Sequence, residues 1–379
     1  MILPGGTIGI LGGGQLGRML ILAGRPMGYR FHVFCPEAES TAGRIADTFT
    51  QAAYDDFDAL ERFARSVDCI TFEFENIPSD SLNKLSEITP IHPKTHVLHI
   101  CQHRQREKDF LKSKQFPCVQ FEYATCPESL KKAVETIGFP SVIKTAAFGY
   151  DGKGQIKLDS EDSISDPQSL WETLNYPDRV VVEQWIEHKG EYSVVCARNE
   201  KGEKASFPVS ENVHIHHILH SSTAPAPISK NIAEHAHTLA EQLADTLEVV
   251  GLLAVEFFLT QDDQLIVNEM APRPHNSGHY TIDACHTSQF QQHIRAITGL
   301  PLGKTDTHTP AVMINILGDL WSKTSPPWNL LFKNPSTQLH LYDKGEARKG
   351  RKMGHYTVLD QNLSLAKKEA EALFLELKD

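Results

Sequence analysis

Apolar and polar residues alternate along the first hundred positions in the way that the strands and helices of an α/β protein do. An apolar run over Thr7–Leu11 leads into a glycine turn, and residues 18–23 after that turn have a helical composition. Strand-like and helix-like segments continue to follow one another as far as residues 70–76. Because alternating strands and helices favour parallel pairing, the pattern predicts an open, mostly parallel α/β sheet.

A different pattern surrounds Glu256 and predicts a β-hairpin. Two apolar, β-rich runs are separated by a short polar turn, which the pattern centres between Asp262 and Asp263. This register places Glu256 opposite Glu269 on the neighbouring strand, where two like charges repel each other. A divalent cation would relieve that repulsion, and Mg²⁺ is typically held by one or two carboxylates. The pair, with the amide of Asn268, is therefore predicted to bind Mg²⁺; the alternative is a strand that holds one glutamate in solvent.

The composition is that of an ordinary globular protein with more than one domain. The 379 residues are 40% hydrophobic and 22% charged, and this length predicts two or three domains. The net charge of -11 and the pI near 5.9 argue against a sequence-independent nucleic-acid binder. No apolar run has the length of a membrane span and no signal peptide is evident, so a cytoplasmic location is predicted. The seven cysteines lack a CxxC pair, which favours reduced thiols.

The glycine turn after the first strand has the pattern of a phosphate cradle. Gly12, Gly14 and Gly17 match G-x-G-x-x-G, and a helix that starts there turns its free N–H groups toward an anion. The acidic residue that a dinucleotide site needs after the second strand is poorly placed, because Cys35 and a proline precede Glu37. Two interpretations follow: a dinucleotide-binding module that is not an enzyme, or a site for a mononucleotide phosphate.

The end of the last strand in this region carries a second group of candidates. Glu73 and Glu75 alternate with aromatic residues before Asn76 and a proline stop. Ligands of open α/β sheets bind at the carboxyl ends of the strands, so Glu75 and Asn76 are predicted to contact a ligand. Glu73 is predicted to lie on a solvent-exposed face of the strand.

A charged helix and a glycine-rich loop follow. Residues 101–114 are predicted to form an exposed helix whose basic side chains, Lys108 among them, are mostly solvated. Lys144 then ends a strand, and three glycines fall in the six residues from Gly149 to Gly154. Such a loop beside a strand lysine suits a lid over nucleotide phosphates, because it supplies backbone donors and can close. The alternative is an ordinary hairpin tip.

The next strands offer the groups that an adenosine moiety needs. A strongly β-patterned run over residues 180–186 is followed by a short polar turn and a second strand near Gly190. Backbone groups from Gln184 to Ile186 are predicted to read the base edge, and Glu191 is predicted to accept two ribose hydroxyls.

A histidine-rich segment offers a competing interpretation. Alternation along one strand would place His214, His216 and His220 on one face, where they could bind zinc. No carboxylate or cysteine completes such a set, so a strand beside the nucleotide site with exposed histidines is favoured instead.

Residues 344–352 form a dense basic cluster in an otherwise acidic protein. A charge run is usually a solvated surface, but the glycines between these basic residues favour an anion site. The cluster and the N-terminal glycine turn are therefore two candidate sites for a substrate phosphate.

These segments together resemble the ATP-grasp superfamily, on the strength of Lys144, the glycine loop, residues 183–186, Glu191 and the carboxylates of the predicted hairpin. Within it, residues 270–279 and 351–355 resemble the N5-carboxyaminoimidazole ribonucleotide synthase family of purine biosynthesis. The resemblance implies an ATP-grasp fold that combines α/β and α+β parts. The implied domains are an N-terminal open parallel α/β domain (1–100), an ATP-grasp domain (101–300) with a lid (116–182), and a small β-rich C-terminal domain (301–379).

Enzymes of that family use ATP and bicarbonate to form carboxyphosphate, and then carboxylate the exocyclic amine of 5-aminoimidazole ribonucleotide, releasing ADP and phosphate. The resemblance also implies a homodimer. The nearest alternative among enzymes is a formate-dependent ATP-grasp glycinamide ribonucleotide transformylase.

The resemblance implies a role for each group of site residues. ATP would contact Arg104, Lys144, Gly149, Tyr150, Asp151, Gly152, Lys153, Gly154, Gln155, Glu183, Gln184, Trp185, Ile186, Glu191, His214, Asn268 and Glu269, with Mg²⁺ on Glu256 and Glu269. Catalysis would involve Tyr150, Asp151, Gly152, Arg273, His275 and Asn276. The ribonucleotide would contact Gly14, Gln15, Leu16, Glu75, Asn76, Lys344 and Arg351.

Overall fold

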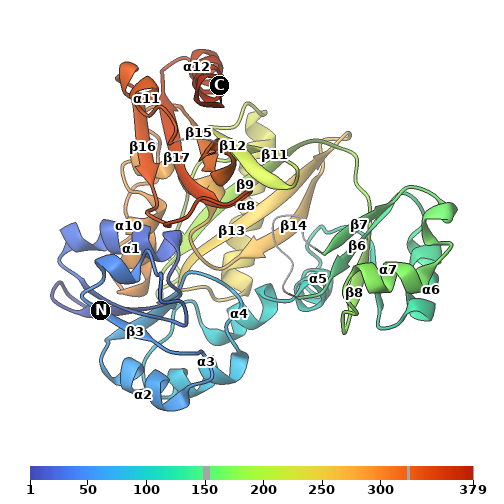
Figure 1. Ribbon diagram of the computed structural model, residues 1–379, viewed down its shortest axis with the longest axis horizontal. Coiled ribbons are helices and arrows are strands. Elements are labelled where there is room, and N and C mark those ends of the chain that lie inside the picture. The colour runs from blue at the N-terminus through green and yellow to red at the C-terminus, as the bar shows by residue number, and fades with distance from the viewer. Residues whose placement is uncertain (148–153, 322–324, 379) are drawn as a thin grey trace.

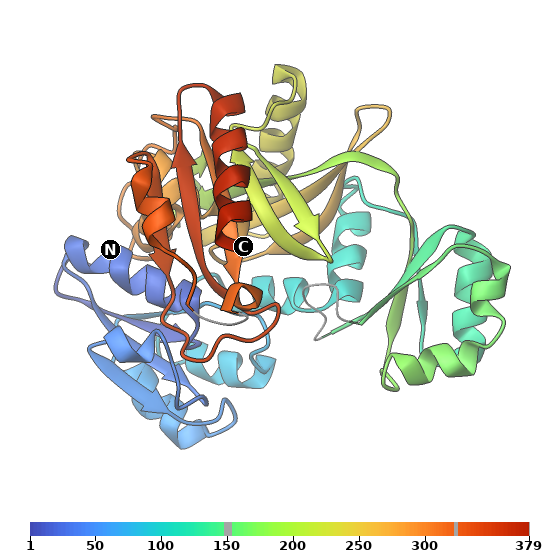
Figure 2. The ribbon, with the colours of Figure 1, turned by 45° about the horizontal axis from the view of Figure 1, so that its top comes forward.

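The computed structural model describes residues 1–147, 154–321 and 325–378. Within these ranges the strands form three sheets: an N-terminal sheet, a lid sheet and a long central sheet (Figure 1). The lid sheet stands at one end of the molecule, apart from the other two, in both Figure 1 and Figure 2. None of the helices in the described ranges combines the length and the hydropathy that a membrane span requires.

The N-terminal sheet is parallel throughout, as its alternating pattern predicts, with strand order β3-β2-β1-β4. The strands are β1 (Thr7–Leu11), β2 (Arg30–Cys35), β3 (Thr48–Gln51) and β4 (Cys69–Phe72). Helix α1 (Gln15–Gly24) packs on one face, while α2 (Phe57–Arg65), α3 (Ser79–Ser86) and α4 (Thr95–Cys101) pack on the other. The predicted strand through Asn76 ends earlier, at Phe72.

The lid is a four-stranded antiparallel sheet with strand order β5-β8-β6-β7. Its strands are β5 (Phe121–Ala124), β6 (Ser141–Thr145), β7 (Gln155–Leu158) and β8 (Val180–Gln184). Helices α6 (Pro127–Ile137) and α7 (Pro167–Thr173) bury Leu130, Val134 and Trp171 against Ile143 and Val182. The lid therefore has a hydrophobic core of its own.

The central sheet is antiparallel and follows the order β14-β13-β9-β11-β12-β15-β17-β16, with β10 beside β9. Its strands are β9 (His188–Arg198), β10 (Lys204–Ser206), β11 (Ser210–Ile215), β12 (Ile218–Ala224), β13 (Gly251–Thr260), β14 (Leu265–Ala271), β15 (Ala311–Leu317), β16 (Thr337–Leu341) and β17 (Lys352–Leu359). Helix α8 (Lys230–Thr246) covers one face of β13, and α9 (Thr281–Ala284) lies against the other. Burial on both faces explains why residues 252–255 are continuously apolar.

The C-terminal strands β15, β17 and β16 continue the central sheet and do not form a sheet of their own. Helix α12 (Leu363–Lys378) packs on β15 and β17, as Figure 2 shows, and α11 (Asn329–Lys333) joins the same hydrophobic cluster. The other helices are α5 (Arg104–Ser113), which leads into the lid, and α10 (Gln289–Ile297), which packs against α1. The described residues thus form an N-terminal parallel sheet domain, a lid, and a β-rich C-terminal region that continues the central sheet.

Candidate active site

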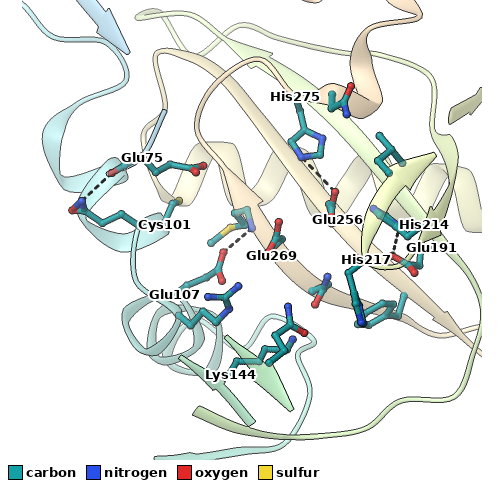
Figure 3. Close-up of a pocket in the computed structure, with 18 of the residues that line it drawn as sticks. Glu75, Cys101, Glu107, Lys144, Glu191, His214, His217, Glu256, Glu269 and His275 are labelled. Carbon is teal, nitrogen blue, oxygen red and sulfur yellow. Dashed lines mark hydrogen bonds and ion pairs between the residues drawn. The ribbon is translucent and has the colours of Figure 1, made fainter. Parts of the chain in front are cut away.

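A cavity of about 520 Å³ lies where the N-terminal sheet, the lid and the central sheet meet (Figure 3). Most of the residues predicted from the sequence line it. They are Gln15, Leu16, Glu75, Asn76, Arg104, Lys144, Gln155, Glu183, Gln184, Trp185, Ile186, Glu191, His214, Glu256, Asn268, Glu269, Arg273, His275 and Asn276. The loop residues Gly149, Tyr150, Asp151, Gly152 and Lys153 lie outside the described residues. Gly14 and Gly154 are close by in the chain but do not line the cavity.

Strands β13 and β14 form the predicted hairpin, and Glu256 faces Glu269 across the ladder. The turn itself differs from the prediction, because Leu259 pairs with Leu265 and the turn is therefore centred on Asp262. A β-bulge next to Glu256 leaves Asn268 without a partner residue on β13. The extra residue shifts the register by one position and so restores the predicted pairing of the two glutamates.

The carboxylates of the two facing glutamates lie in the same cavity. Burial, followed by the neighbouring carboxylate of Glu269, raises the pKa of Glu256 to about 8. The nearest ring is that of His275, whose Nε2 lies 3.4 Å from Glu256 Oε1. Ligand atoms of these three residues lie within 4.8 Å of one another. Two carboxylates at this separation fit a hard divalent cation such as Mg²⁺.

The segment that follows β14 contributes three predicted catalytic residues to the lining of the cavity: Arg273, His275 and Asn276. Arg273 pairs with Glu75 at 3.0 Å, which joins the central sheet to the N-terminal domain. Burial, followed by the charge of Arg273, lowers the pKa of His275 well below its ordinary value, so the imidazole is neutral. Both side-chain polar atoms of Asn276 are buried without a hydrogen-bond partner among the described residues. A buried amide of this kind is suited to a polar ligand.

On the lid side of the cavity, Glu183 holds two lysines. Its Oε2 accepts a hydrogen bond of 2.7 Å from Lys144 Nζ, and its Oε1 lies 3.6 Å from Lys108 Nζ. Burial alone would raise the pKa of Glu183, but the charges of Lys108 and Lys144 outweigh it and lower this pKa to about 2. The prediction that Lys108 is solvated is wrong, because its side chain is only 1% exposed.

The segment between β8 and β9 connects the lid sheet to the central sheet. The two strands belong to different sheets and do not pair, which the sequence pattern alone did not indicate. The Trp185 N–H donates to the carbonyl of Pro140 at 3.1 Å, so this connection stays close to the lid. Beyond it, Glu191 Oε2 lies 2.9 Å from Nδ1 of His214 on the neighbouring strand β11. Two residues that were predicted separately thus contact each other.

The histidine-rich segment is a hairpin, and the prediction of a single alternating strand is wrong. His216 and His217 form the turn between β11 and β12, with φ values of 50° and 65°. The turn separates His214, which pairs with Glu191, from His220, whose Nε2 lies 3.3 Å from Glu371 on α12. The histidines therefore do not share one face, and the zinc interpretation has no support in the described residues.

The N-terminal glycine turn is filled by the side chain of Glu73. The N–H groups of Gly14 and Gly17 donate to its two carboxylate oxygens at 2.5 and 3.3 Å. A Cβ atom on Gly12 would lie 2.4 Å from Glu73 Cγ, so this glycine is required for the close approach. Glu73 is only 8% exposed, which overturns the prediction of a solvent-facing residue. The turn has no room for a phosphate, and the dinucleotide interpretation loses its basis.

The basic cluster lies on the loop between β16 and β17. Arg44 and Arg18 contact Asp343 at 3.2 and 3.7 Å, which docks the start of this loop on the N-terminal domain. A second cavity of about 910 Å³ is lined by the cluster residues Lys344, Arg348, Lys349, Arg351 and Lys352. Gln15 and Lys352 line both cavities, so the two adjoin each other. The residues predicted to hold the ribose phosphate, Lys344 and Arg351, belong to this second cavity.

Two polar residues of the site, Glu107 and Lys108, were missed from the sequence. Both are buried on α5, and both lie on the helix face that Leu111 anchors in the core. Their spacing of four and three positions from Leu111 is the signal that could have identified them as inward-facing.

Three family models match successive parts of the chain. They are a ribonucleotide synthetase preATP-grasp domain over residues 6–102, an ATP-grasp domain over residues 109–290, and a phosphoribosylaminoimidazole carboxylase C-terminal domain over residues 311–369.

Similar proteins and solved structures cover nearly the whole chain. An N5-carboxyaminoimidazole ribonucleotide synthase of Bacillus subtilis is 43% identical over 361 residues, which are 95% of this chain and 93% of the relative. The synthase of Brucella melitensis is 44% identical over 354 residues, with 93% and 96% covered. A crystal structure of an ADP complex of purK matches with a TM-score of 0.94 at 43% identity, over 99% of this chain and 98% of the other. An Aspergillus clavatus synthase in complex with ADP and 5-aminoimidazole ribonucleotide matches with a TM-score of 0.90 at 30% identity, over 98% of both chains.

Proposed function

This chain belongs to the N5-carboxyaminoimidazole ribonucleotide synthase family, and we propose that it uses ATP and bicarbonate to carboxylate 5-aminoimidazole ribonucleotide to the N5-carboxy product. One observation carries the proposal. The carboxylate pair on the hairpin, the lysine of the lid and the segment from Arg273 to Asn276 line one cavity, and that cavity adjoins a basic one. ATP, bicarbonate and a phosphorylated acceptor need such an arrangement of charges.

In the first half-reaction, an oxygen of bicarbonate attacks the γ-phosphorus of ATP. A new O–P bond forms, the bond between the γ-phosphorus and the bridging oxygen breaks, and carboxyphosphate and ADP result. Lys144, held in place by Glu183, neutralises charge on the phosphates. Glu256 and Glu269 would hold Mg²⁺, which supplies further charge neutralisation when it is bound. Arg273 and Asn276, which line the same cavity, are proposed to hold bicarbonate.

In the second half-reaction, carboxyphosphate breaks down to carbon dioxide and phosphate beside the acceptor amine. The amine nitrogen forms a bond to the carbon and loses a proton, which gives the N5-carboxylate. Two groups are candidates to accept that proton: His275, which is neutral, and Asp151 of the glycine loop. A loop that closes over the cavity would keep carboxyphosphate away from water.

The acceptor would lie across the two adjoining cavities. Lys344 and Arg351 of the basic cluster are proposed to hold its ribose phosphate. Gln15 and Leu16 at the start of α1, with Glu75 and Asn76 after β4, are proposed to contact its base and ribose. The ion pair between Glu75 and Arg273 connects this end to the bicarbonate end.

An assay of ADP release separates the proposal from its neighbour in the superfamily. With Mg²⁺ and ATP, 5-aminoimidazole ribonucleotide plus bicarbonate is expected to stimulate ADP release strongly, whereas glycinamide ribonucleotide plus formate is expected to leave it at the background rate. No stimulation by the aminoimidazole ribonucleotide would overturn the proposal, and stimulation by formate and glycinamide ribonucleotide would favour the transformylase.

The homodimer that the family resemblance implies and the cytoplasmic location that the sequence predicts both stay predictions. Sedimentation velocity over a range of protein concentrations would measure the number of copies in the assembly directly.

A further inference from the structure

Helix α5 carries two consecutive charged residues, Glu107 and Lys108, that are buried between the central sheet and the lid. Their exposed fractions are 3% and 1%. Burying an ionisable group costs several kcal/mol unless the group is paired, so the polar partners of these two residues decide whether the location is tolerated. Their polar contacts, with the backbone of Asn268 and of Met270, lie on either side of Glu269. Figure 3 shows Glu107 on the side of the cavity near Glu269.

The first set of contacts completes the outer edge of β14. This strand ends the central sheet, and among the described residues its outer edge has one backbone bridge, from Val267 to the segment at Pro117 and Cys118. Beyond that bridge, the outward groups of Asn268 and Met270 have no strand beside them. Lys108 Nζ donates to the carbonyl of Asn268 at 3.0 Å, and Glu107 Oε1 accepts from the N–H of Met270 at 2.6 Å. Two side chains of one helix thus replace the backbone partners that a further strand would supply. The residue between these two anchors is Glu269.

The second set of contacts reaches the lid. Lys108 Nζ lies 3.6 Å from Glu183 Oε1, and the other oxygen of Glu183 accepts a hydrogen bond of 2.7 Å from Lys144. The start of α5 is also joined to the end of β6, the strand that carries Lys144. The backbone N–H of Arg104 donates to the carbonyl of Ala146, and its Nη1 donates to the carbonyl of Thr145. A single lysine therefore links the backbone beside Glu269 to the carboxylate that holds Lys144.

We propose that Glu107 and Lys108 are positioning residues for the phosphoryl-transfer site. They set the separation between the Glu269 carboxylate on the central sheet and the Lys144 ammonium on the lid. The proposal rests on the proposed function for the roles of Glu269 and Lys144. Well-packed apolar residues would stabilise such a location equally well or better, so the presence of a buried lysine and a buried carboxyl group, each bonded to the backbone beside Glu269, points to geometry as their purpose.

The test compares Lys108→Met with the conservative variant Lys108→Arg and with the control Lys114→Met. Lys114 lies at the C-terminal end of the same helix and is exposed. Calorimetric titration with ADP at a series of Mg²⁺ concentrations requires no acceptor substrate, and thermal unfolding reports whether each variant is folded. Loss of a group that orients a metal ligand typically weakens binding about 10- to 100-fold.

Lys108→Met is expected to weaken Mg²⁺-dependent ADP binding by about tenfold or more and to raise the Mg²⁺ concentration needed for half-saturation. Lys108→Arg is expected to recover most of the loss, and Lys114→Met is expected to bind like the wild type. A folded Lys108→Met protein that binds ADP and Mg²⁺ like the wild type would overturn the proposal.

Glu107 provides the decisive comparison if Lys108→Met does not fold. Glu107→Gln keeps an oxygen for the Met270 N–H, whereas Glu107→Leu removes it. The proposal requires Glu107→Leu to bind ADP with Mg²⁺ about tenfold more weakly than Glu107→Gln, and equal affinities would overturn it. Failure of the proposed function is a separate result: the wild type would bind ADP with Mg²⁺ but show no turnover with 5-aminoimidazole ribonucleotide.

Discussion

Glu183 and Glu256 line the same cavity and are both shielded from solvent, but their surroundings differ completely. Glu183 has two lysines beside it, and its pKa is lowered to about 2. Glu256 has another carboxylate opposite it and a neutral histidine beside it, and its pKa is raised to about 8. Two lysines therefore outweigh the burial of Glu183, whereas the charges of His214 and Lys352 do not outweigh the burial of Glu256 and its facing carboxylate.

Glu73 is a third case, because it accepts hydrogen bonds from backbone groups. Two N–H groups at the start of α1 donate to its carboxylate. The comparison teaches that a buried carboxylate is best judged by what faces it. A carboxylate that faces protein donors is structural, and one that faces another carboxylate indicates a cation site.

The largest effect is expected from Glu269→Ala. Loss of one of two metal-binding carboxylates should lower the rate of ATP turnover by about a thousandfold or more, which corresponds to about 4 kcal/mol. Without Mg²⁺ the thermal stability should stay the same or rise, because the repulsion with Glu256 is removed. ADP release and thermal unfolding measure the two effects, and Asp262→Ala at the exposed tip of the same hairpin is the control. Retained turnover would remove Glu269 from the metal site.

A smaller effect, and one on stability as well as activity, is expected from Glu183→Gln. This change leaves Lys108 and Lys144 without their carboxylate, and breaking a buried ion pair in this way typically costs about 3 kcal/mol or more. Urea unfolding at pH 7 should show the loss. An unchanged free energy of unfolding would mean that the two lysines do not depend on Glu183, and the contrast with Glu256 would disappear.

The stability of the wild type and that of Glu183→Gln should respond differently to acid. The pKa of Glu183 is lowered from 4.5 to about 2 by folding, so its contribution to stability is present above pH 4.5 and is lost as the pH falls toward 2. The stability difference between the wild type and Glu183→Gln should therefore shrink below pH 4.5, by at most about 1.4 kcal/mol per pH unit. Urea unfolding at pH 7, 4.5 and 3.5 measures it. A difference that stays constant over this range would contradict the lowered pKa.

The smallest effect is expected from Glu73→Gln. The amide retains one oxygen for the N–H groups of Gly14 and Gly17, so the free energy of unfolding should fall by about 1 kcal/mol. Because the hydrogen bonds of Glu73 within the described residues go to Gly14 and Gly17, which are not proposed ATP residues, the KM for ATP should not change. Steady-state kinetics and urea unfolding test this. A large rise in the KM for ATP would show that Glu73 takes part in nucleotide binding and is not a purely structural carboxylate.

The parts of the fold and site that were predicted correctly depend on local patterns. Alternating strands and helices identified the parallel N-terminal sheet, and two apolar runs around a polar turn identified the hairpin that pairs Glu256 with Glu269. The exact position of that turn was wrong, because no local signal indicates the bulge at Asn268. The pairing came out correctly since the bulge and the turn shift the register in opposite directions.

The parts that were missed depend on packing between distant segments. Glu73 fills a turn that lies 59 residues earlier in the chain, and Lys108 contacts the carbonyl of a residue 160 positions later. In sequence, both look like ordinary solvated charges. The turn at His216 and His217 was missed for a different reason: both residues adopt a positive φ, which a sequence normally signals by glycine or asparagine.

The continuity of the central sheet has a practical consequence for building chimaeras from related enzymes. The seam between β12 and β15 is a ladder in which Ser221 faces Ile314 and Ser222 faces Met313. A graft that replaces the chain from β15 onward would have to match this ladder residue by residue, or leave β12 as a bare sheet edge. The covalent connections of the lid are the segments before β5 and after β8, and the lid has its own core. It is the part that could be exchanged whole, provided that the graft keeps the contact between Glu183 and Lys108.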